Sequence, residues 1–490
     1  MSEPEQRNER RNERRNERRQ PGRQPRQEHQ ADRQPQPQPR PQPEPGHRPD
    51  GSRQSQQERR ERQADRPQDQ ELRPQDDRQP RSRRKPLDRA RSLRERASVL
   101  DAADELAPAR KLFSLDEGVY LDGNSLGALP AHVPARIADV VARQWGGLRI
   151  RSWDESGWWT APERIGDRIA PLVGAGPGQI VVGDSTSVNV FKAVVGAVRL
   201  AEPGRTDVIV DAATFPSDGY IAESAARMTG LRIVPVEPAG VPSALGPGTA
   251  AVLLNHVDYR SGRLHDLPGL TAAIHGAGAI AVWDLCHSAG ALPVGLDAHG
   301  VDLAVGCTYK YLNGGPGSPA YLYVARRHQA AFDSPLPGWT SHRDPFAMTP
   351  GFTPADGATR GRVGTPDILS MLALDAALDV WDGIAMESVR RKSLALTDFF
   401  LECVEAYTGG PGNRLRPLTP VAHHERGSQI ALRCAEAPAV MERLVARGVV
   451  GDLRRPDVLR FGFTPLYTGF GDTERAAAEL ARVLDEVPAA

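Results

Sequence analysis

The stretches GAIAVWDLCHSAG (278–290) and DLAVGCTYKYLNGGPGSPAYLYV (302–324) contain the residues that decide the fold. Each begins with an apolar run of strand length. Continuous apolar runs, rather than strict alternation, are typical of strands in a sheet that is covered on both faces. Polar side chains follow each run: Asp284 and His287 in the first, Tyr309 and Lys310 in the second. We therefore expect two buried neighbouring strands whose ends carry functional groups.

Similar runs on both sides extend this pattern, and helical or loop sequence separates them. The expected strands are 207–215, 231–237, 250–257, 278–285, 302–310 and 320–327. This alternation predicts an α/β fold with a mostly parallel sheet and helices on both faces. From about residue 375 the pattern becomes helical and then mixed α and β. We expect a tail at 1–97, a large domain at 166–375, and a smaller α+β domain built from 98–165 and 376–490.

The first 97 of the 490 residues differ from the rest in composition. They contain 27 Arg and Lys against 18 Asp and Glu, and the remainder contains 35 against 44. No Val, Ile, Phe, Trp, Tyr or Cys occurs before Val99. Such a segment cannot bury enough apolar surface to offset its ordering entropy, so we expect a disordered tail. A tether for RNA, membrane or a partner is one interpretation, but we favour a nonessential extension and do not expect nucleic acid binding.

The apolar segments and the cysteines indicate the compartment and the class of protein. No stretch has the length and apolarity of a membrane span, and the N-terminus lacks the apolar core of a secretory signal. The four cysteines form neither a CxxC pair nor a metal-like spacing (Cys286, Cys307, Cys403 and Cys434). We therefore expect a cytoplasmic protein without structural disulfides, metal site or membrane contact.

Lys310 and Asp284 at the ends of neighbouring strands suggest a cofactor. Ligands of parallel sheets gather at the carboxyl ends of the strands. Lysine is rarely buried there without a reason, because desolvating an ammonium is costly. In pyridoxal-phosphate (PLP) enzymes a lysine carries the cofactor and a carboxylate faces its pyridine nitrogen. The alternative is a salt bridge at the rim of the sheet, but the Gly-rich loop after Lys310 favours PLP.

Two further segments could complete such a site. GDSTSVNVFKAVVGAV (183–198) begins with hydroxyl residues and continues as an apolar helix, so its start could bind phosphate, or could simply be a capped helix. In TFPSDGY (214–220), Phe215 could stack on the ring and Asp218 could lie near its hydroxyl, although Pro-Ser-Asp-Gly is also turn chemistry. His287 could contact the cofactor or be an ordinary core histidine.

At this point the chain resembles the kynureninase family, fold-type I PLP enzymes related to the class V aminotransferases. The resemblance covers essentially all of residues 100–480. Its motifs follow in order and spacing: YLDGNSLGALP (120–130), TFPSDGY, NHVDYRSG (255–262), WDLCHSAG (283–290), CTYKYLNGGPGSPAYLYV (307–324), GWTSHRDPF (338–346), RVGTPDILS (362–370) and LRFGFTPLYTGF (459–470).

The resemblance implies roles for individual residues. Lys310 would carry PLP, Asp284 would face the pyridine nitrogen, and Tyr309 would assist catalysis. Arg460 would bind the substrate α-carboxylate, which suits a planar guanidinium. Cofactor contacts would come from Thr186, Ser187, Phe215, Pro216, Ser217, Asp218, Asn255, Asp284, His287, Tyr309 and Lys310, and from Trp339 and Thr365 on the second subunit of a homodimer with its active site at the interface.

The implied reaction is hydrolysis of a small molecule, L-kynurenine or 3-hydroxy-L-kynurenine, to L-alanine and anthranilate or its 3-hydroxy form. Another fold-type I activity, such as a cysteine desulfurase or selenocysteine lyase, remains the alternative. Those enzymes need a mobile nucleophilic cysteine, and Cys403 and Cys434 lie in apolar stretches that look structural. A catalytically silent scaffold with a basic tail is the third possibility, although every motif residue is present.

Overall fold

The computed structural model describes residues 86–409 and 414–489, and most of the expected tail lies outside them. Its centre is a seven-stranded sheet with the order β2-β8-β7-β6-β5-β3-β4. The strands of this sheet are β2 (Ile180–Val182), β3 (Asp207–Asp211), β4 (Arg232–Val236), β5 (Thr249–Asn255), β6 (Ile280–Asp284), β7 (Leu303–Gly306) and β8 (Tyr321–Val324). All six expected strands are present, and the short β2 adds an edge that the sequence did not predict.

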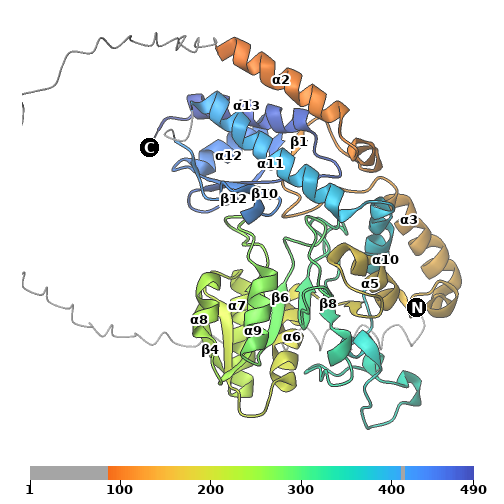
Figure 1. The fold of residues 1–490 in the computed structure, drawn as a ribbon. Coiled ribbons are helices and arrows are strands. Elements are labelled where there is room, and N and C mark those ends of the chain that lie inside the picture. The colour runs from red at the N-terminus through yellow and green to blue at the C-terminus, as the bar shows by residue number, and fades with distance from the viewer. Residues whose placement is uncertain (1–85, 410–413, 490) are drawn as a thin grey trace, which may run out of the picture. The chain divides into compact units, whose positions relative to one another are not determined.

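The two faces of this sheet are covered by different helices (Figure 1). Alternate side chains point to opposite faces: Leu253 and Val282 join one buried cluster, Val252 and Ala281 another. The first cluster includes α6 (Thr186–Leu200) and α7 (Pro216–Thr229). The second includes α5 (Ala161–Ile169), α9 (Leu267–Gly276) and α10 (Ile368–Ala377). Shorter helices are α3 (Val133–Asp139), α4 (Ser152–Glu155) and α8 (Val241–Ala244).

The sheet is parallel except at β8, which runs antiparallel to β7 and β2. Parallel neighbours need a crossover, usually a helix, whereas antiparallel neighbours do not. Between β7 and β8 the chain has only the Gly-rich loop that follows Lys310, so β8 returns in the opposite direction. The carboxyl ends of β3, β5, β6 and β7 therefore meet at one edge of the sheet.

A second sheet, with the order β12-β13-β10-β9, forms the core of the smaller part of the chain. Its strands are β9 (Arg416–Pro417), β10 (Gln429–Arg433), β12 (Asp452–Arg454) and β13 (Val458–Gly462), and β1 (Val119–Tyr120) pairs separately with β11 (Val449–Val450). The helices α11 (Met386–Thr408), α12 (Ala437–Ala446) and α13 (Phe470–Glu486) pack with this sheet in one buried cluster. The buried side chains of the two sheets fall into separate clusters, and the expected division into large and small domains stays a prediction.

The expected end of the tail at residue 97 is wrong. Helix α2 (Pro86–Ala102) begins before it, and Leu93 and Ala97 are buried in the same cluster as α13. These two side chains lie four residues apart and share one helix face, but most of the other side chains are charged, so the sequence pattern does not reveal the buried face. In addition, Ala161 and Ile165 pack in the cluster of the large sheet, so the segment 98–165 does not belong wholly to the small domain.

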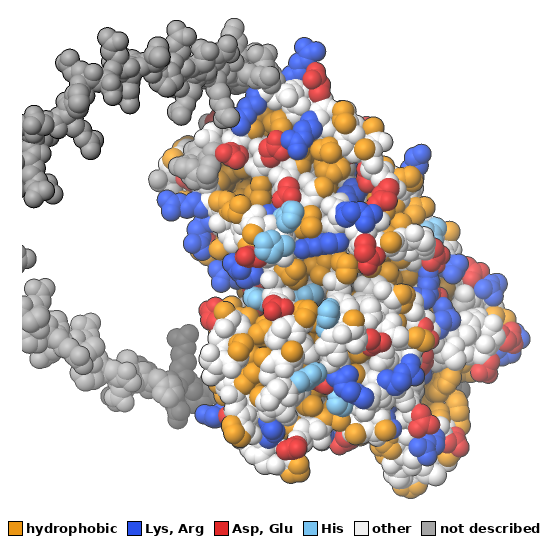
Figure 2. Space-filling view, in the orientation of Figure 1, with side chains coloured by type: hydrophobic (Ala, Val, Ile, Leu, Met, Phe, Trp, Pro, Cys, Tyr) orange, Lys and Arg blue, Asp and Glu red, His pale blue; other side chains and the backbone are white. Residues whose placement is uncertain are grey.

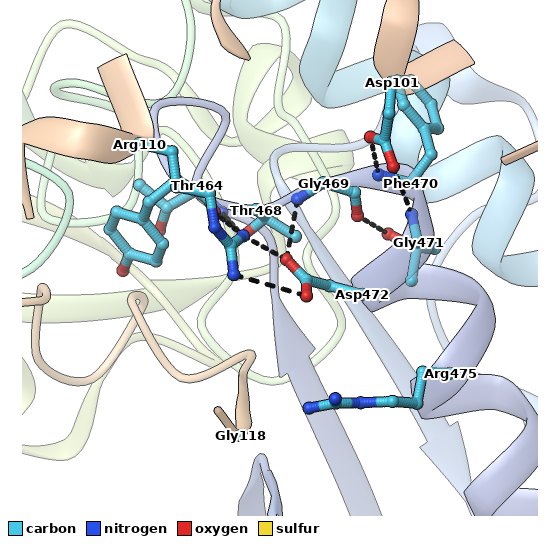
Figure 3. Close-up of polar contacts among 12 residues, drawn as sticks. Asp101, Arg110, Gly118, Thr464, Thr468, Gly469, Phe470, Gly471, Asp472 and Arg475 are labelled. Atoms are coloured by element: carbon cyan, nitrogen blue, oxygen red, sulfur yellow. Dashed lines mark hydrogen bonds and ion pairs between the residues drawn. The ribbon is translucent and has the colours of Figure 1, made fainter. Parts of the chain in front are cut away.

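Asp101 at the end of α2 attaches this helix to the start of α13 (Figure 3). Its carboxylate accepts hydrogen bonds from the backbone N–H groups of Phe470 (2.6 Å) and Gly471 (2.9 Å). Asp472 accepts from the Gly469 N–H at 3.0 Å and forms an ion pair with Arg110. A side chain from α2 therefore supplies the acceptors that the first turn of α13 cannot find within itself.

Candidate active site

A cavity of about 270 Å³ lies at the carboxyl ends of the central strands. Because β6 ends at Asp284 and Lys310 lies four residues after β7, the two side chains come to the same edge of the sheet. Ten of the expected site residues line this cavity: Thr186, Ser187, Phe215, Ser217, Asp218, Asn255, Asp284, His287, Tyr309 and Lys310.

The floor of the cavity contains two buried carboxylates that share one amide. Asn255 Nδ2 donates to Asp284 Oδ2 at 2.7 Å and to Asp218 Oδ2 at 3.3 Å. The Thr214 hydroxyl donates to Asn255 Oδ1 at 2.6 Å, which fixes the amide orientation. Burial and the negative charge of Asp284 raise the pKa of Asp218 well above its usual range. Two carboxylates so close together favour a positively charged partner in the cavity.

Lys310 is half-buried, and its Nζ lies 2.8 Å from His287 Nε2. Burial, followed by the positive charge of Lys310, lowers the pKa of His287 well below its usual range, so the imidazole is neutral at physiological pH. Burial also raises the pKa of Tyr309 above its usual range, which keeps its hydroxyl protonated and able to donate. The lysine therefore stands between a neutral base and a phenol.

The start of α6 forms one wall of the cavity. Ser185 caps the helix, with its Oγ accepting from the Val188 N–H at 3.4 Å, and the expected phosphate contact of this segment stays a prediction. The first N–H groups of a helix have no partner within it, and together with the hydroxyls of Thr186 and Ser187 they suit a phosphate. TFPSDGY is not an isolated turn, because Pro216 begins α7 and Phe215 is its N-cap.

Four expected residues do not line this cavity: Pro216, Trp339, Thr365 and Arg460. Thr365 lines an adjoining cavity of about 510 Å³, which shares Ser185, Thr186 and Tyr309 with the first. Trp339 lies in an aromatic cluster with Trp159, with 5.4 Å between ring centroids. Their expected contacts with the cofactor, from a second subunit, stay a prediction.

Arg460 is fully buried and already has partners. Its Nη1 donates to the backbone carbonyl of Tyr259 at 2.7 Å, its Nη2 donates to Ser125 Oγ at 2.9 Å, and it forms an ion pair with Asp452. It is near enough for its charge to help lower the pKa of His287. A substrate carboxylate would therefore have to compete with Asp452 for this guanidinium.

The structure adds residues that were not predicted for the site. Tyr259 and Cys286 line the cavity, and the ring of Tyr259 meets that of Phe215 edge-on at 5.0 Å. Gln429, on β10 of the small sheet, contacts His287 Nδ1 at 3.1 Å. Tyr259 lies in the motif NHVDYRSG and Cys286 in WDLCHSAG, so the sequence motifs could have indicated both residues. No such signal existed for Gln429, because its contact depends on how the two sheets pack.

The donor set of the cavity fits PLP. It combines a lysine, two neighbouring carboxylates, a helix N-terminus that suits a phosphate, and an aromatic ring. The negative charge of the carboxylates is not fully balanced, because the pKa of Asp218 is raised. A protonated pyridine nitrogen beside Asp284 would supply the missing positive charge. The side chains of Cys403 and Cys434 are buried in the small part of the chain, away from this cavity.

Known proteins resemble this chain over most of its length. Residues 119–425 match the aminotransferase class-V family, and residues 389–480 match the kynureninase C-terminal domain. Kynureninase from Burkholderia pseudomallei (strain 1106a) is 48% identical over 400 residues, which cover 80% of this chain and 95% of that protein. The chain belongs to the kynureninase family. Kynureninase from Deinococcus radiodurans is also similar to this family member, with 49% identity over 79% of this chain and 96% of that protein.

Solved structures share the fold of this kynureninase-family chain. The cysteine desulfurase CsdA from Escherichia coli superposes with a TM-score of 0.67 at 19% identity, covering 78% of this chain and 99% of that one. A C-DES variant with glycine covalently linked to its PLP cofactor has a TM-score of 0.67 at 17% identity, covering 76% and 98%. At such identities the likeness concerns the fold alone. PLP is the cofactor of the family to which the chain belongs.

Proposed function

We propose that this chain is a PLP-dependent hydrolase that cleaves L-kynurenine or 3-hydroxy-L-kynurenine to L-alanine and the corresponding anthranilate. The observation that carries the proposal is the cavity in which Lys310, Asp284 and His287 meet, in a chain that matches kynureninases over four fifths of its length. When bound, PLP accepts the electron pair that is released when a bond to the substrate α-carbon breaks. The reaction would belong to tryptophan degradation through kynurenine.

Lys310 and Asp284 would contact the two reactive groups of the cofactor, its aldehyde and its ring nitrogen. Lys310 Nζ would attach to the aldehyde carbon, and the Asp284 carboxylate would hold a proton on the ring nitrogen. Thr186, Ser187 and the start of α6 would bind the phosphate, and Phe215 would pack on the ring. Once substrate has taken its place on the cofactor, Lys310 Nζ would be free to move the proton at the substrate α-carbon.

Tyr309 and Arg460 would act on the substrate. Water adds to the γ-carbonyl carbon before the Cβ–Cγ bond breaks, and the carbonyl oxygen then needs a donor. Tyr309 keeps its proton because burial raises its pKa, so its hydroxyl can donate there. Arg460 would bind the α-carboxylate, exchanging part of its contact with Asp452 for the substrate.

Addition of PLP followed by L-kynurenine tests this proposal. The protein should gain a visible absorbance band with PLP and then release fluorescent anthranilate and alanine. Lys310→Ala should lose both properties, whereas Lys111→Ala, on the surface, should keep them. Release of sulfide from cysteine without anthranilate would favour a desulfurase, and a protein that stays colourless with PLP would contradict the assignment of the cavity.

A homodimer with shared active sites is the second part of the proposal. Trp339, Phe346 and Met348 are 41%, 67% and 75% exposed, and the first two lie with Trp159 in one aromatic cluster. Contiguous exposed apolar side chains mark an interaction surface. A second copy is the favoured occupant, because Trp339 does not line the cavity of its own chain and the family resemblance implies that it reaches the phosphate site of the second subunit. Phe346→Glu should lower the sedimentation coefficient, unlike Val421→Glu in the small domain.

Surface charge and free thiols support the proposed absence of a nucleic acid partner and the proposed cytoplasmic compartment. On the face shown in Figure 2, basic and acidic side chains of the described residues are interspersed, which supports a small-molecule substrate rather than nucleic acid. All four cysteines are free thiols, as in a reducing cytoplasm. Among the described helices none is long and apolar enough to cross a membrane.

A further inference from the structure

Gln429 is the only small-domain side chain whose hydrogen bond to His287 the structure describes, and it reaches this histidine from β10. It is buried, and its two amide atoms face different groups. Its Nε2 donates to the backbone carbonyl of Tyr259 at 3.1 Å, and its Oε1 lies 3.1 Å from His287 Nδ1. A backbone carbonyl can only accept hydrogen bonds, so the Tyr259 contact fixes which end of the amide faces the histidine.

This orientation determines where His287 carries its proton. With the amide in this orientation, Gln429 Oε1 accepts from Asn124 Nδ2 at 3.2 Å and can only accept from His287, so Nδ1 of His287 carries the hydrogen. Burial and the positive charges of Lys310, Arg460 and Arg454 all lower the pKa of His287, so the ring has a single proton. Its Nε2 is then bare and accepts a hydrogen bond from Lys310 Nζ, 2.8 Å away.

We propose that Gln429 is a positioning residue that sets the tautomer of His287 and thereby holds Lys310 Nζ at the mouth of the cofactor site. The opposite tautomer would place an N–H against the lysine ammonium and push it away. The same Tyr259 carbonyl also accepts from Arg460 Nη1, so one backbone atom ties Gln429 to the expected substrate-carboxylate site. This inference rests on the proposed function of Lys310, but the tautomer itself does not.

The first test addresses the tautomer without cofactor or substrate. In the ¹⁵N spectrum of histidine-labelled protein, His287 (assigned through His287→Gln) should give the signals of a neutral ring protonated at Nδ1. Gln429→Leu should shift its population toward Nε2–H. A wild-type His287 that is protonated at Nε2, or one that does not respond to Gln429→Leu, would overturn the proposal, whatever the enzyme's activity.

The second test follows the capture of PLP by Lys310, measured as the rate at which visible absorbance appears between about pH 5 and pH 8, the window in which imidazoles titrate. Loss of a group that orients an active-site imidazole costs about 10- to 100-fold at metal sites, and we expect about tenfold slower capture and turnover for Gln429→Leu at every pH, with little change in KM. Gln329→Leu, a half-buried glutamine distant from the cavity, is the matched control and should behave like wild type.

Gln429→Glu separates positioning from a merely structural role. Its carboxylate still accepts from Nδ1–H but favours a second proton on His287, which would then repel Lys310. Capture should approach the wild-type rate at high pH and fall as pH decreases. Equal losses in the Glu and Leu variants without pH dependence would mean that Gln429 only supports packing. Normal capture with no kynurenine cleavage would instead count against the proposed reaction.

Discussion

Replacing Asp101 by alanine should loosen the start of α13 and the helix α2, whose last turn contains Asp101. The change removes two hydrogen bonds from the Phe470 and Gly471 N–H groups to a carboxylate. Loss of an N-cap costs about 0.5–2 kcal/mol, and a negative charge at a helix N-terminus adds about 0.3–1 kcal/mol. Because Asp101 is only half-buried and these contributions overlap, we expect about 2 kcal/mol in total.

Hydrogen exchange measures this loss locally, without the assumption that so large a chain unfolds in one step. A loss of 2 kcal/mol corresponds to about 30-fold faster exchange in peptides covering 86–102 and 470–486. Asp101→Asn keeps a neutral acceptor and should give an intermediate rate. Asp485→Ala removes an exposed carboxylate at the other end of α13 and serves as the control. If Asp101→Ala exchanged no faster than this control, the capping role would be refuted.

Further predictions concern buried charges. Asp184→Asn should lower the free energy of unfolding by about 3 kcal/mol, and with it the urea midpoint, because the buried Lys192 ammonium loses its 2.8 Å ion pair; Asn tolerates the left-handed backbone at this position (φ 56°), so an unchanged midpoint would contradict this role. Burial lowers the pKa of His256 to about 3, so wild-type stability should fall as pH decreases below about 6.5, where the unfolded state alone binds the proton; His256→Phe should flatten this slope in thermal melts. The raised pKa of Asp218 means that its contribution to stability is lost as pH rises, so Asp218→Asn should raise the melting temperature of the PLP-free protein at neutral pH while weakening PLP binding in a titration.

Much of the catalytic cavity could be predicted from the sequence because its residues are local to strand ends. Asp284 ends β6 and Lys310 follows β7, and any parallel arrangement of these neighbours brings both side chains to one edge. The hydroxyls of α6 follow the same logic, since a Ser at the N-cap fixes where a helix begins. For these groups the position along the chain is nearly equivalent to the position in space.

Other features could not be read from the chain. The end of the tail was misplaced because Leu93 and Ala97 are few among charged residues, and only their contact with α13 identifies α2 as part of the fold. Arg460 was expected to face the substrate, but whether a guanidinium is free depends on its neighbours, and here Asp452 is its ion partner. No sequence pattern indicates either the burial of this face of α2 or the ion pair of Arg460.

The sequence by itself therefore determined the sheet and the meeting of Lys310 and Asp284 at its edge, because apolar runs and the polar residues that end them are encoded side by side. Only the tertiary structure decided how the small domain enters the site. Gln429 lies 142 residues from His287, and no local periodicity links the two. Packing of the two sheets brings a glutamine amide to an imidazole, and that contact gives Lys310 its neighbour.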